Sequence, residues 1–308
     1  MNLLKRRLPC LAVAVITLFT LTACAPAKNI SKAGLNVTVT TTMLLDLTQQ
    51  IGGDCVNVQG LMGSGVDPHQ YRASAGDVIK MQQADVVIYS GLHLEGKMGE
   101  VLSSLESYGK TVICAADGID EELLIQNDGV YDPHIWFDVK LWQMAAEEVA
   151  EGLSAADPDN GSVYEYNLAV YTRRLEELEQ YIRAKTSELS ENQRVLITAH
   201  DAFGYFGRAY GFTVMGLQGV STAAEAGTAD VSHLAAFIAE NRVHAVFIET
   251  SLPVKSIEAL QEAVRAKGFE TRLGGALYSD SLGDERNGEN SYIAAFVHNI
   301  DVIVEGLV

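Results

Sequence analysis

The stretch that decides the fold is DPDNGSVYEYNLAVYTRRLEELEQYIRAKTSEL, residues 157–189. Its opening Asp-Pro-Asp-Asn-Gly is typical of a turn followed by a helix start. The apolar residues that follow fall mostly three, four or seven positions apart, which is the period of one helical face. They are Tyr164, Leu168, Tyr171, Leu175, Leu178, Ile182 and Leu189. A helix over about 160–189 is on the order of 45 Å long at ~1.5 Å per residue, so we expect one long helix to join two lobes.

Short β-branched runs alternate with helical patterns on both sides of this helix. Before it, strands are predicted at 36–42, 56–61, 85–90 and 111–115, and helices at 43–51, 74–83, 97–107 and 139–152. After it, strands are predicted at 195–198, 213–217, 245–249 and 270–274, and helices at 202–209, 230–240, 255–267 and 291–306. This alternation predicts an α/β fold with parallel sheets. The expected parts are an N-terminal lobe (36–156), a linking helix (157–190) and a C-terminal lobe (191–308).

The first residues are typical of a secretory signal. Lys5, Arg6 and Arg7 precede an apolar run over 8–21 that is short for a permanent membrane helix. The run ends in Leu-Thr-Ala-Cys at Cys24, which resembles the lipobox of bacterial lipoproteins. We expect residues 1–23 to be removed, Cys24 to carry the lipid, and residues 24–35 to form a polar tether. The alternatives are an ordinary cleaved signal and a single membrane helix. The expected location is extracytoplasmic, at the membrane, in the periplasm or on the cell surface.

The composition narrows the possible partners. The chain has 308 residues, with Lys+Arg 22 against Asp+Glu 40, and a net charge of -18. This balance argues against nucleic acid, since phosphate contacts need clustered basic residues. Cys10 lies in the signal, and Cys55 and Cys114 remain as either a disulfide or two thiols.

Two histidines share one local motif. His69 and His134 each end an Asp-Pro-His triplet in a loop downstream of a predicted strand. Proline fixes its own backbone and restricts the residue before it, so each imidazole is held in a defined direction. A neighbouring carboxylate, from Asp67, Asp132 or Asp138, can accept the second ring N–H and fix the tautomer of a metal-bound histidine.

Two further candidate ligands follow strands of the second lobe. His200 ends Val-Leu-Ile-Thr-Ala-His, and Asp280 comes shortly after the strand predicted at 270–274. Ligands of open α/β sheets bind beyond the carboxyl ends of the strands, so each lobe offers two side chains to one cleft. Three imidazoles and one carboxylate suit Zn²⁺, and Mn²⁺ if the carboxylate supplies a second oxygen. The alternative is that each histidine is an ordinary loop or core residue.

Five longer motifs resemble one known family. GLMGSGVDPHQY, DPHIWFDVKLW, VLITAHDAFGYFGRAYGF, GLQGVSTAAEAG and YSDSLG are similar to the zinc- and manganese-binding lipoproteins that deliver metal to ABC importers. The resemblance covers about residues 36–303. It implies two lobes on a rigid backbone helix, one Zn²⁺ or Mn²⁺ per chain as transported ligand, and a membrane permease as partner.

The same resemblance implies the ligand set. His69, His134, His200 and Asp280 fall on the four metal-ligand positions. A histidine at the third position, together with an aspartate at the fourth and no histidine in residues 117–131, is most similar to the Tro-type branch. The resemblance to that branch implies zinc or manganese as cargo. We expect a monomer.

Other polar residues are set aside. We expect His93, which also follows a strand, to be structural or to support a ligand, and His233, His244 and His298 to be packing or surface residues. Glu225 and Glu249 are not expected to be ligands, because a single loop carboxylate more often caps a helix or pairs with arginine.

The function predicted from these observations is a lipid-anchored metal receptor and not an enzyme. One alternative is a zinc-dependent hydrolase, but the chain contains no HExxH, GxSxG or GxxxxGK[ST] motif. A second alternative is an adhesin, or a haem or siderophore receptor, on the same two-lobe scaffold.

Overall fold

The computed structural model describes residues 34–127 and 129–308, and Gly34–Val308 forms one compact unit. The predicted signal peptide, Cys24 and nearly all of the predicted tether lie outside the described residues. Within the part of the chain that is described, no helix combines the length and the apolar character needed to cross a bilayer.

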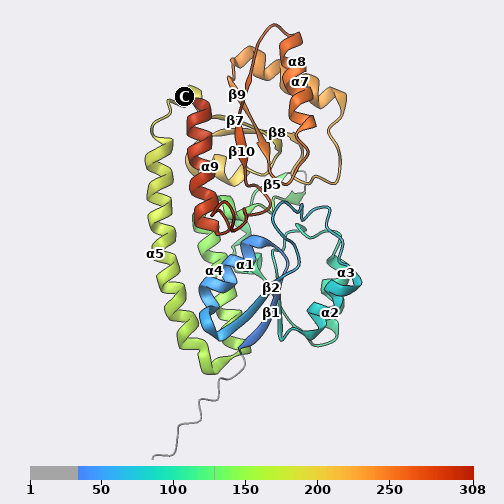
Figure 1. Ribbon diagram of the computed structural model, residues 1–308, viewed down its shortest axis with the longest axis vertical. Helices are drawn as coiled ribbons and strands as arrows, with labels where there is room; N and C mark the ends of the chain where they lie inside the picture. The colour runs from blue at the N-terminus through green and yellow to red at the C-terminus, as the bar shows by residue number, and fades with distance from the viewer. Residues whose placement is uncertain (1–33, 128) are drawn as a thin grey trace, which may run out of the picture. The chain divides into compact units, whose positions relative to one another are not determined.

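The first lobe is built on a four-stranded parallel sheet in the order β2-β1-β3-β4 (Figure 1). Its elements are β1 (Leu35–Val39), α1 (Thr42–Gly52), β2 (Val56–Gly60), α2 (Ala75–Gln83), β3 (Val86–Tyr89), α3 (Gly99–Ser107), β4 (Thr111–Cys114) and α4 (Val139–Ala156). Both faces of the central strand β3 are buried. Val86 and Ile88 pack into the core that contains α1 and α4, while Val87 packs against α2 and α3. A continuous apolar strand is what a sheet with helices on both faces requires.

The second lobe repeats this arrangement. Its elements are β7 (Val195–His200), α6 (Gly204–Tyr210), β8 (Thr213–Gln218), α7 (Thr228–Asn241), β9 (Ala245–Glu249), α8 (Lys255–Ala266), β10 (Arg272–Leu277) and α9 (Tyr292–Leu307). β7 pairs with β8 and β9 with β10, both in parallel, and β7 lies beside β9. The strand order β8-β7-β9-β10 therefore matches that of the first lobe. The predicted α/β class with two similar lobes is confirmed.

The long helix α5 runs from Gly161 to Thr186 along both lobes (Figure 1). Its 26 residues span about 39 Å at ~1.5 Å per residue. α5 packs against α1 and α4 of the first lobe and against α9 of the second. The buried stripe consists of Tyr164, Tyr171, Leu175, Leu178, Ile182 and Thr186. The prediction of a single long helix between the lobes is confirmed.

Two strands, β1 and β10, end three residues away from their predicted positions. β1 stops at Val39 because the hydroxyl of Thr41 accepts the N–H of Leu44 at 3.3 Å and so caps α1. β10 lies later than predicted, and its pairing with β9 shifts register between Leu273 and Gly275. Gly275 has φ 145, a conformation that side chains other than glycine rarely adopt. The shift moves the end of β10 to three residues before Asp280.

Both cysteines of the described chain are free thiols. Cys55 and Cys114 are each partly buried, and they form no disulfide. Burial, together with the carboxylate of Asp117, raises the pKa of Cys114 to about 12. A thiol with so high a pKa is a poor nucleophile at neutral pH, so Cys114 is unreactive. Of the two states that the sequence left open, the structure has the free thiols.

The structure also contains a short hairpin that the sequence did not predict. Its antiparallel strands are β5 (Gln126–Asn127) and β6 (Val130–Tyr131). The hairpin lies on the path from β4 to His134, so it belongs to the connection that carries this histidine to the carboxyl end of the sheet.

Candidate metal centre

Four side chains from four separate loops or strand ends meet at one point. His69 lies between β2 and α2, His134 follows β6, His200 is the last residue of β7, and Asp280 lies three residues beyond β10. One ligand atom from each lies within 4.8 Å of those of the other three. None of the four is more than 4% exposed. The structure thus brings together the four residues that the sequence singled out, two from each lobe.

The distances from the Nε2 of His134 to the other two imidazoles match the edges of a tetrahedron. The Nε2 of His134 lies 3.3 Å from the Nε2 of His69 and 3.3 Å from that of His200. For metal–nitrogen bonds of ~2.0–2.1 Å, the edge of a regular tetrahedron is about 3.3–3.4 Å. The imidazoles are therefore spaced as ligands of one small ion.

The carboxylate of Asp280 faces the three imidazoles with both of its oxygens. Oδ1 lies 3.4 Å from the Nε2 of His134, and Oδ2 lies 3.3 Å from the Nε2 of His200 and 4.0 Å from that of His69. Within the described chain neither oxygen has a hydrogen-bond partner, although both are fully buried. A buried carboxylate needs a partner of opposite charge, and a divalent cation at the centre supplies that charge when the imidazoles are neutral. Two available oxygens suit Zn²⁺ with one bond or Mn²⁺ with two.

Two of the imidazoles are oriented by buried carboxylates. Oδ1 of Asp132 lies 2.7 Å from the Nδ1 of His134 and also accepts the backbone N–H of this histidine at 2.9 Å. In the other lobe, Glu249 lies 2.6 Å from the Nδ1 of His200 and accepts its backbone N–H at 2.8 Å. A carboxylate at Nδ1 fixes the tautomer that leaves Nε2 free for a metal, and it makes the imidazole a stronger donor.

The third imidazole is held differently. Asp67 accepts the backbone N–H of His69 at 2.8 Å with one oxygen, and its other oxygen accepts the hydroxyl of Thr222 at 2.6 Å. Of the three aspartates expected near the histidines, Asp132 is at a ring nitrogen and Asp67 is at a backbone amide. The third, Asp138, caps α4 by accepting the N–H of Lys140.

Glu249 is the site residue that sequence reasoning missed. It is 2% exposed and contacts His200 through both carboxylate oxygens. The signal that could have found it is its place at the end of a strand beside β7, because parallel strands end at the same edge of a sheet. The expectation that Glu249 is not itself a ligand agrees with its place behind the imidazole.

At two glycines, the backbone passes very close to His200 and to Asp132. A Cβ at Gly216 would lie 2.4 Å from the carbonyl carbon of His200, so β8 can pass this close only with glycine. A Cβ at Gly204 would lie 2.8 Å from a carboxylate oxygen of Asp132, where the start of α6 meets the other lobe. Glycine at these two positions lets the chain pack directly against the site.

Burial and mutual attraction set the charges of the site. Burial would raise the pKa of Asp280, but the imidazoles of His200 and His134 outweigh it and hold that pKa well below its usual range. Burial would likewise lower the pKa of His134, yet Asp132 and Asp280 raise it to about 9. For His69 burial prevails and lowers the pKa to about 3. The carboxylate is thus ionised, and a binding cation displaces protons from the imidazoles that hold them.

An aromatic wall closes the site on the side of His134. The ring of Trp136 lies 5.2 Å from that of His134, edge to face, and its Nε1 donates to the carbonyl of Ser279 at 2.9 Å. Trp136 therefore touches one ligand and holds the backbone next to another. Such a wall excludes water and strengthens the electrostatic interactions at the centre.

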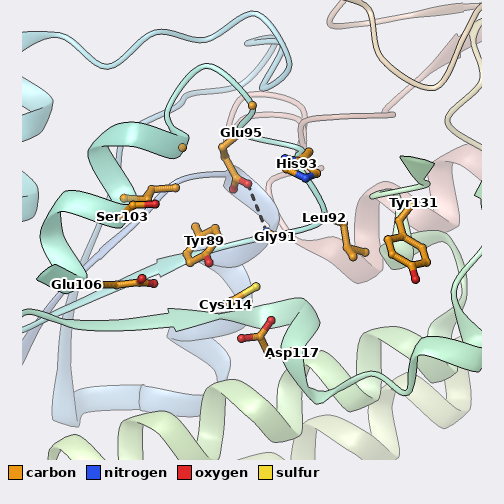
Figure 2. Close-up of a pocket in the computed structure, with 13 residues that line it drawn as sticks. Tyr89, Gly91, Leu92, His93, Glu95, Ser103, Glu106, Cys114, Asp117 and Tyr131 are labelled. Atoms are coloured by element: carbon orange, nitrogen blue, oxygen red, sulfur yellow. Dashed lines mark hydrogen bonds between the residues drawn. The ribbon is translucent and has the colours of Figure 1, made fainter. Parts of the chain in front are cut away.

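His93 lies elsewhere, at a surface pocket of about 340 Å³ (Figure 2). Leu92 and His93 have φ of 52 and 65, in the left-handed region. The buried carboxylate of Glu95 stabilises this turn by accepting the N–H groups of Ser90 at 2.8 Å and Gly91 at 3.3 Å. His93 thus belongs to a structural turn on the surface of the first lobe.

The other histidines of the second lobe also lie outside the group. His298 lies 2.7 Å from Glu289, His244 packs against Phe269, and His233 is exposed on α7. These positions agree with the expected packing and surface roles.

Comparison with known proteins places this fold and centre in a family. The family model described as "Zinc-uptake complex component A periplasmic" (ZnuA) matches residues 37–306. The chain belongs to this family.

Two curated relatives of this ZnuA-family chain cover almost all of it. The zinc-binding protein TroA of Treponema pallidum (strain Nichols) is 44% identical over 299 residues, which are 96% of each chain. The manganese-binding lipoprotein MntA of Bacillus subtilis (strain 168) is 41% identical over 300 residues, 96% of this chain and 98% of that one.

A solved structure shares the whole fold. The periplasmic zinc binding protein TroA from Treponema pallidum aligns with a TM-score of 0.87 at 45% identity, covering 89% of this chain and 99% of that chain. The resemblance to metal-binding proteins of ABC importers is thereby confirmed at the level of the family.

Proposed function

We propose that this protein is an extracytoplasmic receptor that captures one Zn²⁺ or Mn²⁺ and delivers it to the permease of an ABC importer. His69, His134, His200 and Asp280 are the proposed ligands. The observation that carries the proposal is the spacing of their donor atoms, 3.3–3.4 Å along three edges that meet at His134, inside a site that is at most 4% exposed.

The closed character of the site favours transport over catalysis. A catalytic zinc keeps one coordination position for water or substrate, whereas a holding site is filled by the protein. Here one donor atom from each of four protein side chains lies within 4.8 Å of the other three. The hydrolase alternative therefore has no position for an attacking water, and family membership speaks against the adhesin and haem-receptor alternatives.

Location and partner follow from the relatives and from the sequence. MntA and several further relatives are lipoproteins by name, and relatives in streptococci are substrate-binding lipoproteins of ABC transporters. We propose that Cys24 carries the lipid, that residues 24–35 tether the lobes to the membrane, and that the protein acts as a monomer. The lobe limits at residues 36–156 and 191–308 belong to the same proposal.

Metal content is the direct test. Gently purified protein should carry about one equivalent of zinc or manganese by elemental analysis. His69→Ala, His134→Ala and His200→Ala should each lose it on desalting. His233→Ala is the matched control, because it removes an exposed imidazole on α7, and it should keep the metal.

Thermal unfolding gives an independent readout. Adding Zn²⁺ or Mn²⁺ at about 1,000-fold above Kd to the metal-free protein should stabilise it by ~4 kcal/mol, seen as a higher melting temperature. If neither ion changes the melting temperature, the receptor proposal fails.

The choice of cargo depends on the carboxylate. Asp280→Asn keeps the volume of the side chain but removes its charge and one oxygen donor. Affinity for Mn²⁺ should fall by a larger factor than affinity for Zn²⁺, because Mn²⁺ depends more on oxygen ligands. Competition titrations with a chelator at fixed pH measure both factors, and equal losses would contradict the two-oxygen role of Asp280.

A further inference from the structure

The three proposed histidine ligands differ in what holds them. His134 and His200 each have a carboxylate of their own lobe at Nδ1, as described above. The loop of His69 is instead held across the gap between the lobes. Asp67, two residues before His69, uses one carboxylate oxygen to accept the hydroxyl of Thr222 at 2.6 Å.

Thr222 belongs to the second lobe. It lies between β8 and α7, in the motif GLQGVSTAAEAG that the metal site itself does not use. Its side chain is bonded to Asp67, and its backbone carbonyl accepts the side-chain amide of Gln70 at 2.7 Å. Thr222 is only 6% exposed. Thr222 therefore forms hydrogen bonds with the loop on both sides of His69, at Asp67 and at Gln70.

The same loop meets the second lobe again at its other end. The hydroxyl of Ser64 donates to the carbonyl of Leu282 at 2.8 Å, and the N–H of Gly65 donates to the hydroxyl of Ser281 at 2.8 Å. Leu282 and Ser281 directly follow Asp280. Contacts with the opposite lobe thus hold residues 64–70 at both ends.

We propose that Thr222 is a positioning residue that latches the His69 loop onto the second lobe and thereby sets the rate at which the metal leaves. This inference rests on the proposed function. When the latch is engaged, His69 stays at the ion. When the hydrogen bond between Thr222 and Asp67 breaks, His69 can move away from the ion together with its loop. His134, His200 and Asp280 stay in place.

The chemistry of the contact makes it suited to this role. A hydrogen bond from a hydroxyl to a carboxylate is charge-assisted, and it is stronger than one between neutral groups when water is excluded. A lost ligand converts four coordination bonds into three, so dissociation is faster from the unlatched state. Opening this contact requires no change in protonation, and it adds no further ligand to the metal.

The experiment compares two substitutions of one residue. Thr222→Val keeps the shape and removes the hydroxyl, whereas Thr222→Ser keeps the hydroxyl. Protein loaded with Zn²⁺ or Mn²⁺ is mixed with excess chelator in a stopped-flow instrument, and the fluorescence of Trp136 beside His134 reports metal loss. Thr222→Val should raise the dissociation rate about tenfold, as expected for loss of one charge-assisted hydrogen bond. Thr222→Ser should stay within about twofold of the unchanged protein.

A matched control separates latching from general destabilisation. Thr186→Val removes an equally buried hydroxyl, which donates to the carbonyl of Arg183 in α5. It should leave the dissociation rate unchanged. A rate for Thr222→Val equal to that of the unchanged protein, or an equal rise in Thr186→Val, overturns the proposal.

A second variant covers the case in which Thr222→Val does not fold. Gln70 is exposed, and its side-chain oxygen accepts Lys97 while its amide donates to Thr222. Gln70→Glu keeps the acceptor for Lys97 and removes the donor to Thr222, so it should raise the dissociation rate several-fold. An unchanged rate counts against the latch. Failure of the unchanged protein to retain any metal is a different result, because it overturns the proposed function itself.

Discussion

The two lobes share one strand order but present their proposed metal ligands in different ways. In the second lobe, His200 is the last residue of β7 and Asp280 follows β10 by three residues. In the first lobe, His69 follows the end of β2 by nine residues and His134 follows the end of β4 by twenty, so both ligands sit on longer connections. Ligands on short connections to a sheet are fixed in place by the fold. Ligands on long loops depend on what else holds the loop, which for His69 is the opposite lobe.

The largest expected effect tests this difference directly. His200→Ala should weaken metal binding by more than His69→Ala, because loss of His69 leaves both ligands that the second sheet fixes in place, whereas loss of His200 removes one of them. If one of four ligands carries about a quarter of ~10–16 kcal/mol, the losses in affinity are on the order of 10²–10³-fold. Chelator competition measures both, and a larger loss for His69→Ala would refute the distinction between fixed and loop-borne ligands.

Next in size are the carboxylates that orient two imidazoles. Glu249→Gln should weaken metal binding by about 10–100-fold, because the new amide donates to Nδ1 and forces the ring proton onto Nε2, where the metal binds. Asp132→Asn should do the same in the first lobe. Isothermal titration of the metal-free variants measures the loss. Unchanged affinity in either variant would mean that its carboxylate does not set the tautomer.

A smaller effect, on the free energy of unfolding, is expected at a contact between the lobes that lies away from the metal site. Asp46 on α1 is buried and accepts the N–H of Tyr292, the first residue of α9, at 2.9 Å. Asp46→Ala leaves this N–H without its partner and should lower the free energy of unfolding by about 1–3 kcal/mol. Urea unfolding of the metal-free protein checks it. Asp54→Ala, an exposed change nearby in the chain, should change little, and equal effects would show that the contact between lobes contributes nothing specific.

The smallest effect lies in the first lobe, at the start of α2. Ser74 and Asp77 form a capping box, and Ser74→Ala should cost about 1 kcal/mol with metal affinity unchanged. Burial would raise the pKa of Asp77, but hydrogen bonds from Ser74, Tyr71 and Lys80 lower it to about 2. A lowered pKa stabilises the fold above the usual value of 3.8, and this contribution is lost as the pH falls toward 2.

Asp77→Asn isolates this dependence on pH. The difference in unfolding free energy between the unchanged protein and this variant should be largest above about pH 4 and shrink as the pH falls toward 2. Urea titrations of the metal-free proteins across that range measure the difference. A difference that stays constant over the whole range would contradict the lowered pKa.

Much of the fold could be predicted from local patterns. The period of Tyr164, Tyr171 and Leu175 gave the linking helix, since one buried face of a long helix repeats regularly. The buried run at β9 was placed at its observed limits, 245–249. The predicted strand limits were wrong where a single residue sets the end of the strand. Thr41 ends β1 early by capping α1, and the backbone of Gly275 moves β10.

The candidate site was predictable where motif and strand end coincide. His69 and His134 carry an Asp-Pro-His triplet, and His200 ends a strand, so each has a local signal. Glu249 also ends a strand, but its role depends on β9 lying beside β7, and Thr222 has no local signal. The contact between Thr222 and Asp67 joins residues 155 positions apart, and only the packing of one lobe on the other creates it.

One feature of the second sheet links the metal centre to the solubility of the protein. In the described chain no shared ladder joins the pair β7-β8 to the pair β9-β10, although β7 and β9 lie side by side. Glu249, at the end of β9, contacts His200, at the end of β7. One carboxylate oxygen accepts the backbone N–H of His200, and the other lies 2.6 Å from its ring Nδ1. His200, a proposed metal ligand, therefore also joins the two strand pairs. A substitution that removes this contact leaves the two strand pairs less firmly joined, and edge-to-edge aggregation becomes a hazard for that variant.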